Sequence, residues 1–217
     1  SLRRTVLSLA GRVPAGRAVR DRATQIAEAF LAGEAVTKET LSVALGLYAR
    51  FGGEAEYRRV FDAFLAEADS TRRSALLRSV GQFRFAGFPE RVFQDAFNEA
   101  LRVNERSRFV WAPAAYHGFR TKAWSWVLAN LERVRALLPR NGARYLPYFP
   151  VSQCDAAVIA EMRSAFKPWS TGDNDVEGID RHLQTAIERI EQCVARRTRF
   201  ASTMSELLVP YRTTGSK

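Results

Sequence analysis

The chain has 217 residues, of which 47% are hydrophobic and 26% are charged, and its formal net charge is +10. This hydrophobic share is sufficient for a sizeable core and argues against long disordered stretches. No apolar run approaches the ~18–20 residues that a membrane-spanning helix needs, and the first residues lack the long apolar segment of a signal peptide. Because the chain does not begin with Met and contains only two Met, we expect it to be the interior or C-terminal part of a longer protein.

The positive charge is concentrated in two stretches. Residues 1–22 carry a net charge of +5 and residues 102–144 a net charge of +7, whereas residues 23–101 and 145–217 carry −2 and 0. An excess of basic residues is typical of nucleic-acid-binding proteins. However, only four of the 33 basic residues are Lys. Since such an Arg bias often reflects a GC-rich coding sequence, we do not expect nucleic acid to be the main partner.

Apolar residues recur at helical spacing through most of the chain. The clearest apolar stripes lie within residues 23–31, 57–68 and 92–101. Each stripe is wide, so each helix must pack against several neighbours to remove the stripe from water. The pattern predicts helices over residues 2–11, 17–32, 38–51, 54–68, 71–81, 89–103, 121–138, 153–167, 177–200 and 202–208.

Several helix ends carry the residues that favour them. Gly33 is placed to end the second helix, where a left-handed residue is common. Thr37 is placed to cap the third helix, and either Asp69 or Ser70 can cap the fifth. Pro89 fits the first turn of the sixth helix, because its missing N–H is not needed there. These signals predict compact helices joined by short connections.

The order of these elements indicates the fold class. No segment shows sustained alternation of period two, so we expect little or no sheet. The helix–turn–helix spacing of about 36 residues lies in the range of solenoid repeats. We therefore predict an all-α fold, a superhelical stack of antiparallel helix pairs of the HEAT or ARM kind. It would form a single lobe over residues 1–208, followed by a disordered tail over residues 209–217.

The two cysteines, Cys154 and Cys193, lie 39 residues apart and form no CxxC motif. We expect two buried free thiols. A disulfide that joins neighbouring helices is the alternative, and it would indicate an oxidising compartment. A metal site would need His117 or His182 as further ligands, and no two of these four residues have the spacing of metal ligands.

The sequence carries no motif for catalysis. HExxH, GxSxG, GxGxxG and GxxxxGK[ST] are all absent. His117 and His182 are 65 residues apart, so they cannot supply the two imidazoles, one helical turn apart, that hydrolytic zinc chemistry uses. We therefore assign no catalytic residue, no metal ligand and no cofactor to this chain.

One stretch, residues 104–124, combines basic and aromatic side chains and is only partly helical in pattern. In one interpretation, the aromatic side chains fill the core where the helical stack changes direction, and the arginines extend outward. In the other, the stretch forms a concave basic surface that binds a carboxylate or phosphate, because guanidinium and ammonium groups hold a peptide's terminal carboxylate well. The candidate peptide-binding residues are Arg108, Tyr116, Arg120 and Lys122.

Three segments resemble one known family. Residues 121–134 read T-K-A-W-S-W-V-L-A-N-L-E-R-V and are similar to the Trp-containing helix near the C-terminus of the aminopeptidase-N family of zinc metallopeptidases. Arg189–Arg197 (R-I-E-Q-C-V-A-R-R) resembles the terminal helix of that family. Ser152–Phe166 is similar to the segment between these helices in bacterial members, and the spacing of Ala23, Ala27 and Phe30 fits the opening helices of the same lobe.

The resemblance implies a role for the chain. In the family, this lobe is a right-handed superhelix of HEAT-like helix pairs that covers the zinc site of the preceding catalytic domain and shapes a cavity for peptides. The catalytic and zinc-binding residues belong to the catalytic domain, so zinc is expected only in that part of the parent enzyme. The implied partners are the catalytic domain and peptide substrates, without a membrane. The resemblance is to bacterial proteins of the cytoplasm or periplasm.

Two other functions stay open from the sequence. The chain could be a stand-alone basic HEAT-like module that follows a nucleic-acid backbone by charge. It could also be a scaffold that binds a partner helix in a groove, because such grooves leave no sequence motif. The tryptophans that could stack on bases in the first case are Trp111, Trp124, Trp126 and Trp169.

Overall fold

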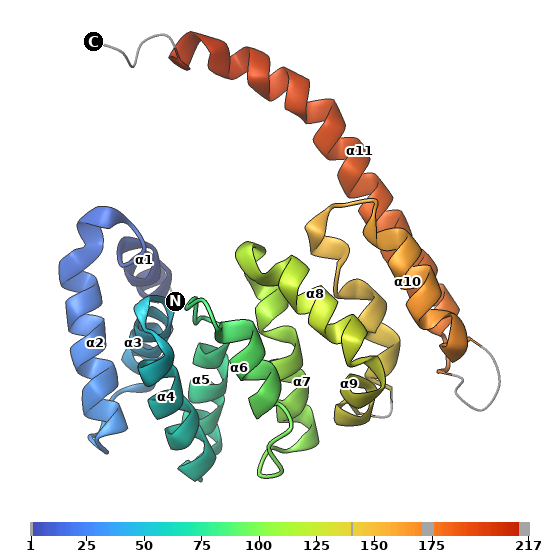
Figure 1. Ribbon diagram of the computed structural model, residues 1–217. Coiled ribbons are helices and arrows are strands. Elements are labelled where there is room, and N and C mark those ends of the chain that lie inside the picture. The colour runs from blue at the N-terminus through green and yellow to red at the C-terminus, as the bar shows by residue number, and fades with distance from the viewer. Residues whose placement is uncertain (1, 140, 171–175, 213–217) are drawn as a thin grey trace. The chain divides into compact units, whose positions relative to one another are not determined.

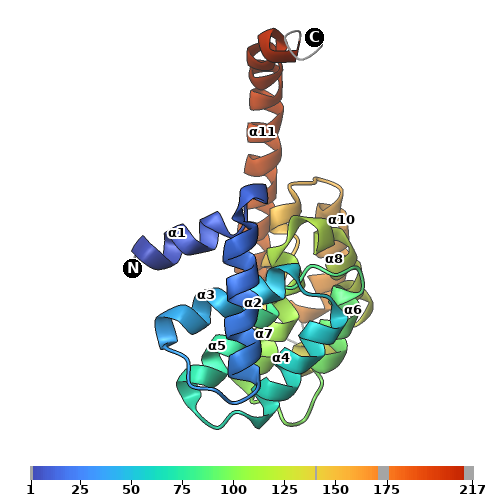
Figure 2. The same ribbon diagram turned by 90° about the vertical axis from the view of Figure 1, so that its left-hand side faces the viewer.

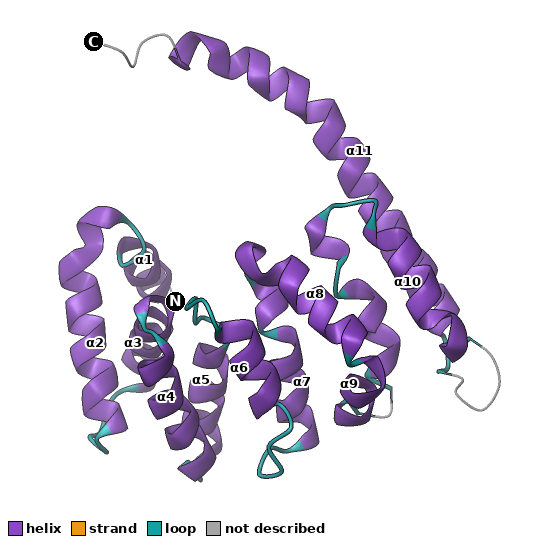
Figure 3. Cartoon of the chain, viewed as in Figure 1, coloured by secondary structure: helices purple, strands orange, loops and turns teal. Residues whose placement is uncertain are grey.

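The computed structural model describes residues 2–139, 141–170 and 176–212. All regular elements in these ranges are helices, and the ranges contain no strand, which confirms the all-α prediction (Figure 3). The backbone contacts divide the chain into two compact units. The first comprises residues 1–119 with 136–139, and the second comprises residues 120–135 with 140–217.

The first unit is a stack of helices in two rows. α1 contacts α3, α3 contacts α5, and α5 contacts α7, whereas α2 contacts α4 in the other row. Figure 2 shows α3 and α5 on one side and α4 and α6 on the other. This order is consistent with a solenoid. The helices are α1 (Leu2–Ala10), α2 (Arg17–Leu31), α3 (Lys38–Phe51), α4 (Glu54–Ala66), α5 (Ser70–Val80), α6 (Phe88–Asp95) and α7 (Val103–Trp111), with 3-10 helices η1 (Pro14–Gly16), η2 (Pro113–Ala115) and η3 (His117–Phe119).

The ends of α2 to α6 follow the sequence signals. Gly33 has φ +94° after α2, as expected of the residue that ends a helix. Asp69, rather than Ser70, caps α5, because its Oδ1 accepts the Arg72 N–H at 2.8 Å. Pro89 lies in the first turn of α6. Thr37 occupies the N-cap of α3, but its hydroxyl donates to Thr40 Oγ1 at 2.9 Å instead of accepting from the helix backbone.

A buried ion pair between Arg73 on α5 and Glu105 on α7 connects the helices of the first unit. The two residues are only 8% and 5% exposed. Arg73 Nε donates to Glu105 Oε1 at 2.7 Å, and Arg73 Nη2 donates to Oε2 at 2.9 Å. The pair is therefore bidentate, the geometry in which a guanidinium holds a carboxylate most strongly.

The same two side chains complete two helix ends. Arg73 Nη1 donates to the carbonyl of Phe64 at 2.8 Å, and at 3.3 Å to those of Leu65 and Glu67, at the C-terminus of α4. Glu105 Oε2 accepts the N–H of Arg102 at 2.9 Å, at the start of α7. Groups that a helix end leaves without intrahelical partners are thus satisfied inside the core.

An aromatic cluster fills the space beside this ion pair. Tyr57 is fully buried and packs edge-on against Phe83 and Phe88, with ring centroids 5.3 and 5.9 Å apart. Its hydroxyl donates to Asp95 Oδ2 at 2.7 Å. Burial, together with the negative charge of Asp95, raises the pKa of Tyr57, so the phenol stays protonated and remains a hydrogen-bond donor.

The second unit is organised around one long helix, α11 (Ile179–Arg212). Its N-terminal part contacts α10, η4 and η5, and Figure 1 shows its C-terminal part extending beyond them. Residues 195–201 of α11 are exposed. The other elements are α8 (Arg120–Ala129), α9 (Leu131–Leu137), α10 (Val158–Phe166) and the 3-10 helices η4 (Ala143–Tyr148), η5 (Val151–Gln153) and η6 (Lys167–Trp169).

Two predicted helices are shorter than expected, and an asparagine lies at each break. The helix predicted over 89–103 ends at Asp95, and Asn98 Oδ1 then accepts the N–H of Ala100 at 2.9 Å. The helix predicted over 121–138 breaks into α8 and α9 at Asn130, whose Nδ2 donates to the Trp126 carbonyl at 3.0 Å. In both cases the side-chain amide competes with the helix for backbone groups.

The last predicted helices also differ from the structure. Cys154 adopts a left-handed backbone (φ 56°), so α10 begins only at Val158 rather than at residue 153. The helices predicted over 177–200 and 202–208 form the single helix α11, which includes residues 209–212 of the expected tail. The remainder of that tail, residues 213–217, and the loop at 171–175 lie outside the described residues.

The prediction of two free thiols is wrong. Cys154 and Cys193 form a disulfide, with their Cα atoms 5.4 Å apart, and both residues are half-buried. The bond forms because η5, which Cys154 directly follows, packs against α11, which carries Cys193. It closes a loop of 39 residues and attaches α11 covalently to the rest of the second unit.

Removal of this disulfide should destabilise the second unit. The disulfide restricts the conformations of the unfolded chain and so lowers its entropy. The Cys154→Ser, Cys193→Ser double variant should therefore lose about 2–4 kcal/mol of unfolding free energy. Denaturant unfolding followed by circular dichroism measures the loss. A reducing agent should lower the stability of the original chain by a similar amount and leave that of the double variant unchanged. Equal stability of the two oxidised proteins would contradict this role.

Loss of the Glu105 charge should destabilise the first unit strongly. The Glu105→Gln variant leaves the Arg73 cation buried without its counter-ion, which typically costs about 3–5 kcal/mol. The exposed neighbour Glu99 provides the matched control, because Glu99→Gln removes the same charge from the surface and should cost less than about 0.5 kcal/mol. Urea unfolding of the three proteins at neutral pH measures both values.

The ion pair also predicts how stability depends on pH. The hydrogen bonds from Arg73 lower the pKa of Glu105 below its ordinary value of 4.5, despite an opposing effect of burial. A depressed pKa means that this stabilisation is complete above the pKa of the unfolded chain and is lost as pH falls through the lower, folded pKa. Between neutral pH and pH ~3, the original chain should therefore lose more stability than Glu105→Gln. Identical pH profiles would contradict the assignment.

Candidate functional site

The four residues singled out from the sequence fall into two pairs. Arg108, in the last turn of α7, and Tyr116, between η2 and η3, belong to the first unit, and both are exposed. Arg120 and Lys122 form part of the first turn of α8 in the second unit. The structure thus brings together the members of the second pair, which share one helical turn.

Arg120 has a structural contact as well as a charge. Its Nη1 donates to the carbonyl of Ser152 at 2.8 Å, and Thr121 Oγ1 donates to Gln153 Oε1 at 3.4 Å. These bonds hold the start of α8 against η5. Lys122, the residue after Thr121, is exposed. The start of α8 therefore presents a positive charge at the surface of the second unit.

Tyr116 belongs to a cationic neighbourhood that the sequence did not reveal. The guanidinium of Arg84 lies 4.6 Å from the centre of the Tyr116 ring, a cation–π contact. Burial lowers the pKa of Arg84, and the positive charges of Arg50 and Arg12 lower it further. The three arginines are far apart in sequence, so only the folded first unit shows that they lie close enough to repel one another.

The aromatic residues of the 104–124 stretch are mostly part of the core. Phe109 is fully buried, Phe119 is 9% exposed and Trp124 is 2% exposed. Trp124 Nε1 donates to Glu161 Oε2 at 2.8 Å, and the equally buried Trp169 donates to Glu132 Oε1 at 2.6 Å. These two indoles therefore cannot stack on nucleic-acid bases, whereas Trp111 and Trp126, the other two tryptophans named for that alternative, are half-buried.

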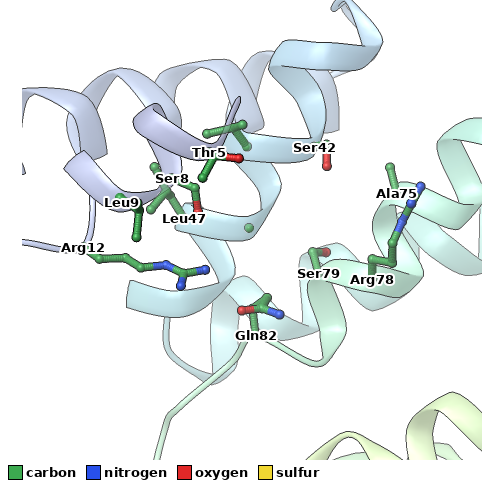
Figure 4. A pocket seen from close by; sticks show the side chains of 12 residues that line it. Thr5, Ser8, Leu9, Arg12, Ser42, Leu47, Ala75, Arg78, Ser79 and Gln82 are labelled. Atoms are coloured by element: carbon green, nitrogen blue, oxygen red, sulfur yellow. The ribbon is translucent and has the colours of Figure 1, made fainter. Parts of the chain in front are cut away.

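A cavity of about 410 Å³ opens between α1, α3 and α5 of the first unit (Figure 4). Arg12, which follows α1, and Arg78, on α5, contribute the charged side chains, and the lining contains no carboxylate. The other polar side chains in the lining are Thr5, Ser8, Ser42, Ser79 and Gln82. The sequence signal for this site is the positive charge of residues 1–22, which by itself does not predict a cavity.

The described residues contain no cluster of three or more His, Cys, Asp or Glu side chains that could hold a metal ion. His182 lies instead beside Tyr148, with its Nδ1 3.2 Å from the phenolic oxygen, and burial lowers the pKa of this histidine. Within the same residues, no helix has the length and apolar character to cross a bilayer.

The helices stacked in two rows define an all-α domain, and their order is consistent with a solenoid. Residues 1–192 match the model of the family described as the ERAP1-like C-terminal domain. The chain belongs to this family, the all-helical C-terminal domain of aminopeptidase-N-like M1 peptidases. The match confirms the resemblance found in the sequence. No curated protein matches the chain.

Proposed function

We propose that this chain is the non-catalytic C-terminal domain of a zinc aminopeptidase, where it covers the active site and shapes the cavity that receives peptides. The observation that carries this proposal is the family match over residues 1–192. Domains of this family form part of multidomain aminopeptidases, so the natural partner is the catalytic domain of the same polypeptide. That domain would hold the zinc ion and remove the N-terminal residue of the substrate.

Within this role, the basic end of α8 is suited to the far end of a peptide. A peptide held by its N-terminus at the zinc site presents its C-terminal carboxylate at a distance set by its length. Guanidinium and ammonium groups bind such a carboxylate through charge-assisted hydrogen bonds. We therefore propose Arg120 and Lys122 as peptide-binding residues of the second unit, whereas Arg108 and Tyr116 of the first unit stay a prediction from the sequence.

Substitution of the α8 charges in the complete enzyme tests this assignment. The double variant Arg120→Ala, Lys122→Ala should raise KM by about three- to tenfold for a peptide of about nine residues with a free C-terminal carboxylate. It should leave kcat unchanged, because no group at the reacting bond is altered. An amidated peptide of the same sequence and a single-residue substrate should show no change in KM.

Arg163→Ala provides the matched control, because Arg163 is an exposed cation on α10 of the same unit. Its KM should equal that of the unmodified enzyme for every substrate. An unchanged KM for the free-acid peptide in the double variant would overturn the role of Arg120 and Lys122. An equal rise for the free-acid and the amidated peptide would show that the charges do not recognise the carboxylate.

A further inference from the structure

The cavity between α1, α3 and α5 has the chemistry of an anion site. Figure 4 shows Arg12 reaching from the α1 side toward Gln82 and Ser79 on the α5 side. Arg78 also lines the cavity, and its side chain extends back along α5 beside Ala75 (Figure 4), where its Nε donates to the Ser74 carbonyl at 3.0 Å.

Neutral donors accompany the two cations. Thr5 and Ser8 on α1 and Ser42 on α3 place hydroxyl groups in the lining. Ser79 does not add to them, because its Oγ already donates to the Leu76 carbonyl at 2.7 Å. Hydroxyl and guanidinium donors on several sides of one cavity match an acceptor with oxygen atoms pointing in several directions, as in a tetrahedral phosphate.

Gly46 lines this cavity, and because it has no side chain it leaves that part of the cavity open. It lies in the middle of α3, where glycine usually lowers helix stability, and a Cβ at this position would have no atom within 4 Å. Packing between helices therefore does not require the glycine. The space that a side chain would fill belongs to the cavity, since Gly46 is one of its lining residues.

The two cations that line the cavity, Arg12 and Arg78, form no ion pair within the described residues. Arg50 and Arg84, which do not line it, form none there either. Arg84 Nε is buried and lacks a hydrogen-bond partner. The charges of Arg12 and Arg50 act on Arg84 unfavourably. A bound anion beside Arg12 would relieve this repulsion.

We propose that the cavity between α1, α3 and α5 binds a phosphate-bearing small molecule, with Arg12 and Arg78 as the principal charged contacts. The site lies wholly within the first unit, and its lining contains none of the candidate peptide-binding residues. A ligand here would contact α1, α3 and α5 together, so it would stabilise the packing of α1 on the stack.

Calorimetric titration of the full chain with pyrophosphate tests the proposal. The expected result is a single site with a Kd between about 10 µM and 1 mM. Tricarballylate, at the same ionic strength, serves as the comparison, because its three carboxylates approximately match the charge of pyrophosphate at neutral pH without supplying phosphate. It should bind at least about tenfold more weakly, and equal binding of the two would overturn the assignment to phosphate.

Three variants locate the site. Arg12→Ala and Arg78→Ala should each weaken pyrophosphate binding by about tenfold or more, because each removes a charge-assisted hydrogen bond. Gly46→Leu should abolish binding by filling the cavity. Arg58→Ala is the matched control, since Arg58 is an exposed arginine on α4 that pairs with Glu54 and does not line the cavity. It should bind within about twofold of the original chain.

Each outcome of these titrations either supports the proposed site or overturns it. Absence of pyrophosphate binding to the original chain would overturn the proposal. Binding that survives in Arg12→Ala and Arg78→Ala, or that falls equally in Arg58→Ala, would place the anion elsewhere or show a general charge effect. Arg12 and Arg78 are exposed, so their variants should unfold at the same temperature as the original chain and remain informative even if Gly46→Leu fails to fold.

Discussion

The first unit depends on one constraint, the burial of a guanidinium among helix ends. Arg73 is almost removed from water, and it remains charged because Glu105 faces it at 2.7 Å. A buried cation without such a partner would be strongly destabilising. The same guanidinium also donates to the Phe64 carbonyl at the C-terminus of α4, where the helix end leaves carbonyl oxygens without intrahelical partners. The ion pair thus fixes α4, α5 and α7 in one arrangement, around which the aromatic cluster packs.

The described residues of the second unit are held together by a disulfide and by hydrogen bonds between buried indoles and carboxylates, rather than by a buried ion pair. The disulfide joins η5 to α11, and the buried indoles of Trp124 and Trp169 are satisfied by carboxylates at 2.8 and 2.6 Å. These contacts hold α8, with its exposed basic end, against the rest of its unit. A rigid support of this kind is what a domain needs if its surface charges are to meet a ligand at a fixed position.

The sequence predicted the parts of the fold that depend on local patterns. The helices α2 to α5 follow the spacing of apolar residues and the cap residues at Gly33 and Asp69. The breaks after Asp95 and at Asn130 were missed, because each depends on how a side-chain amide competes with a helix that its neighbours still favour. The sequence left the disulfide only as the alternative to two free thiols, because the bond follows from the packing of η5 on α11, which the spacing of two cysteines does not encode.

The candidate sites also differ in whether the sequence alone could predict them. The basic start of α8 could be found from sequence, because Arg120 and Lys122 are neighbours on one helical turn. The convergence of Arg12, Arg50 and Arg84 could not, because it joins a turn after α1, the end of α3 and a connection after α5. Net charge in residues 1–22 was visible, but its location at a cavity is a property of tertiary structure.

The sequence of the coding region upstream of Ser1 tests the proposed role most directly. A C-terminal domain of a zinc aminopeptidase predicts an open reading frame that continues upstream into a helix with the HExxH motif, followed by a later glutamate ligand. A start codon immediately before Ser1 would contradict that role. It would make the chain a free-standing helical protein, for which the basic surface would need another ligand.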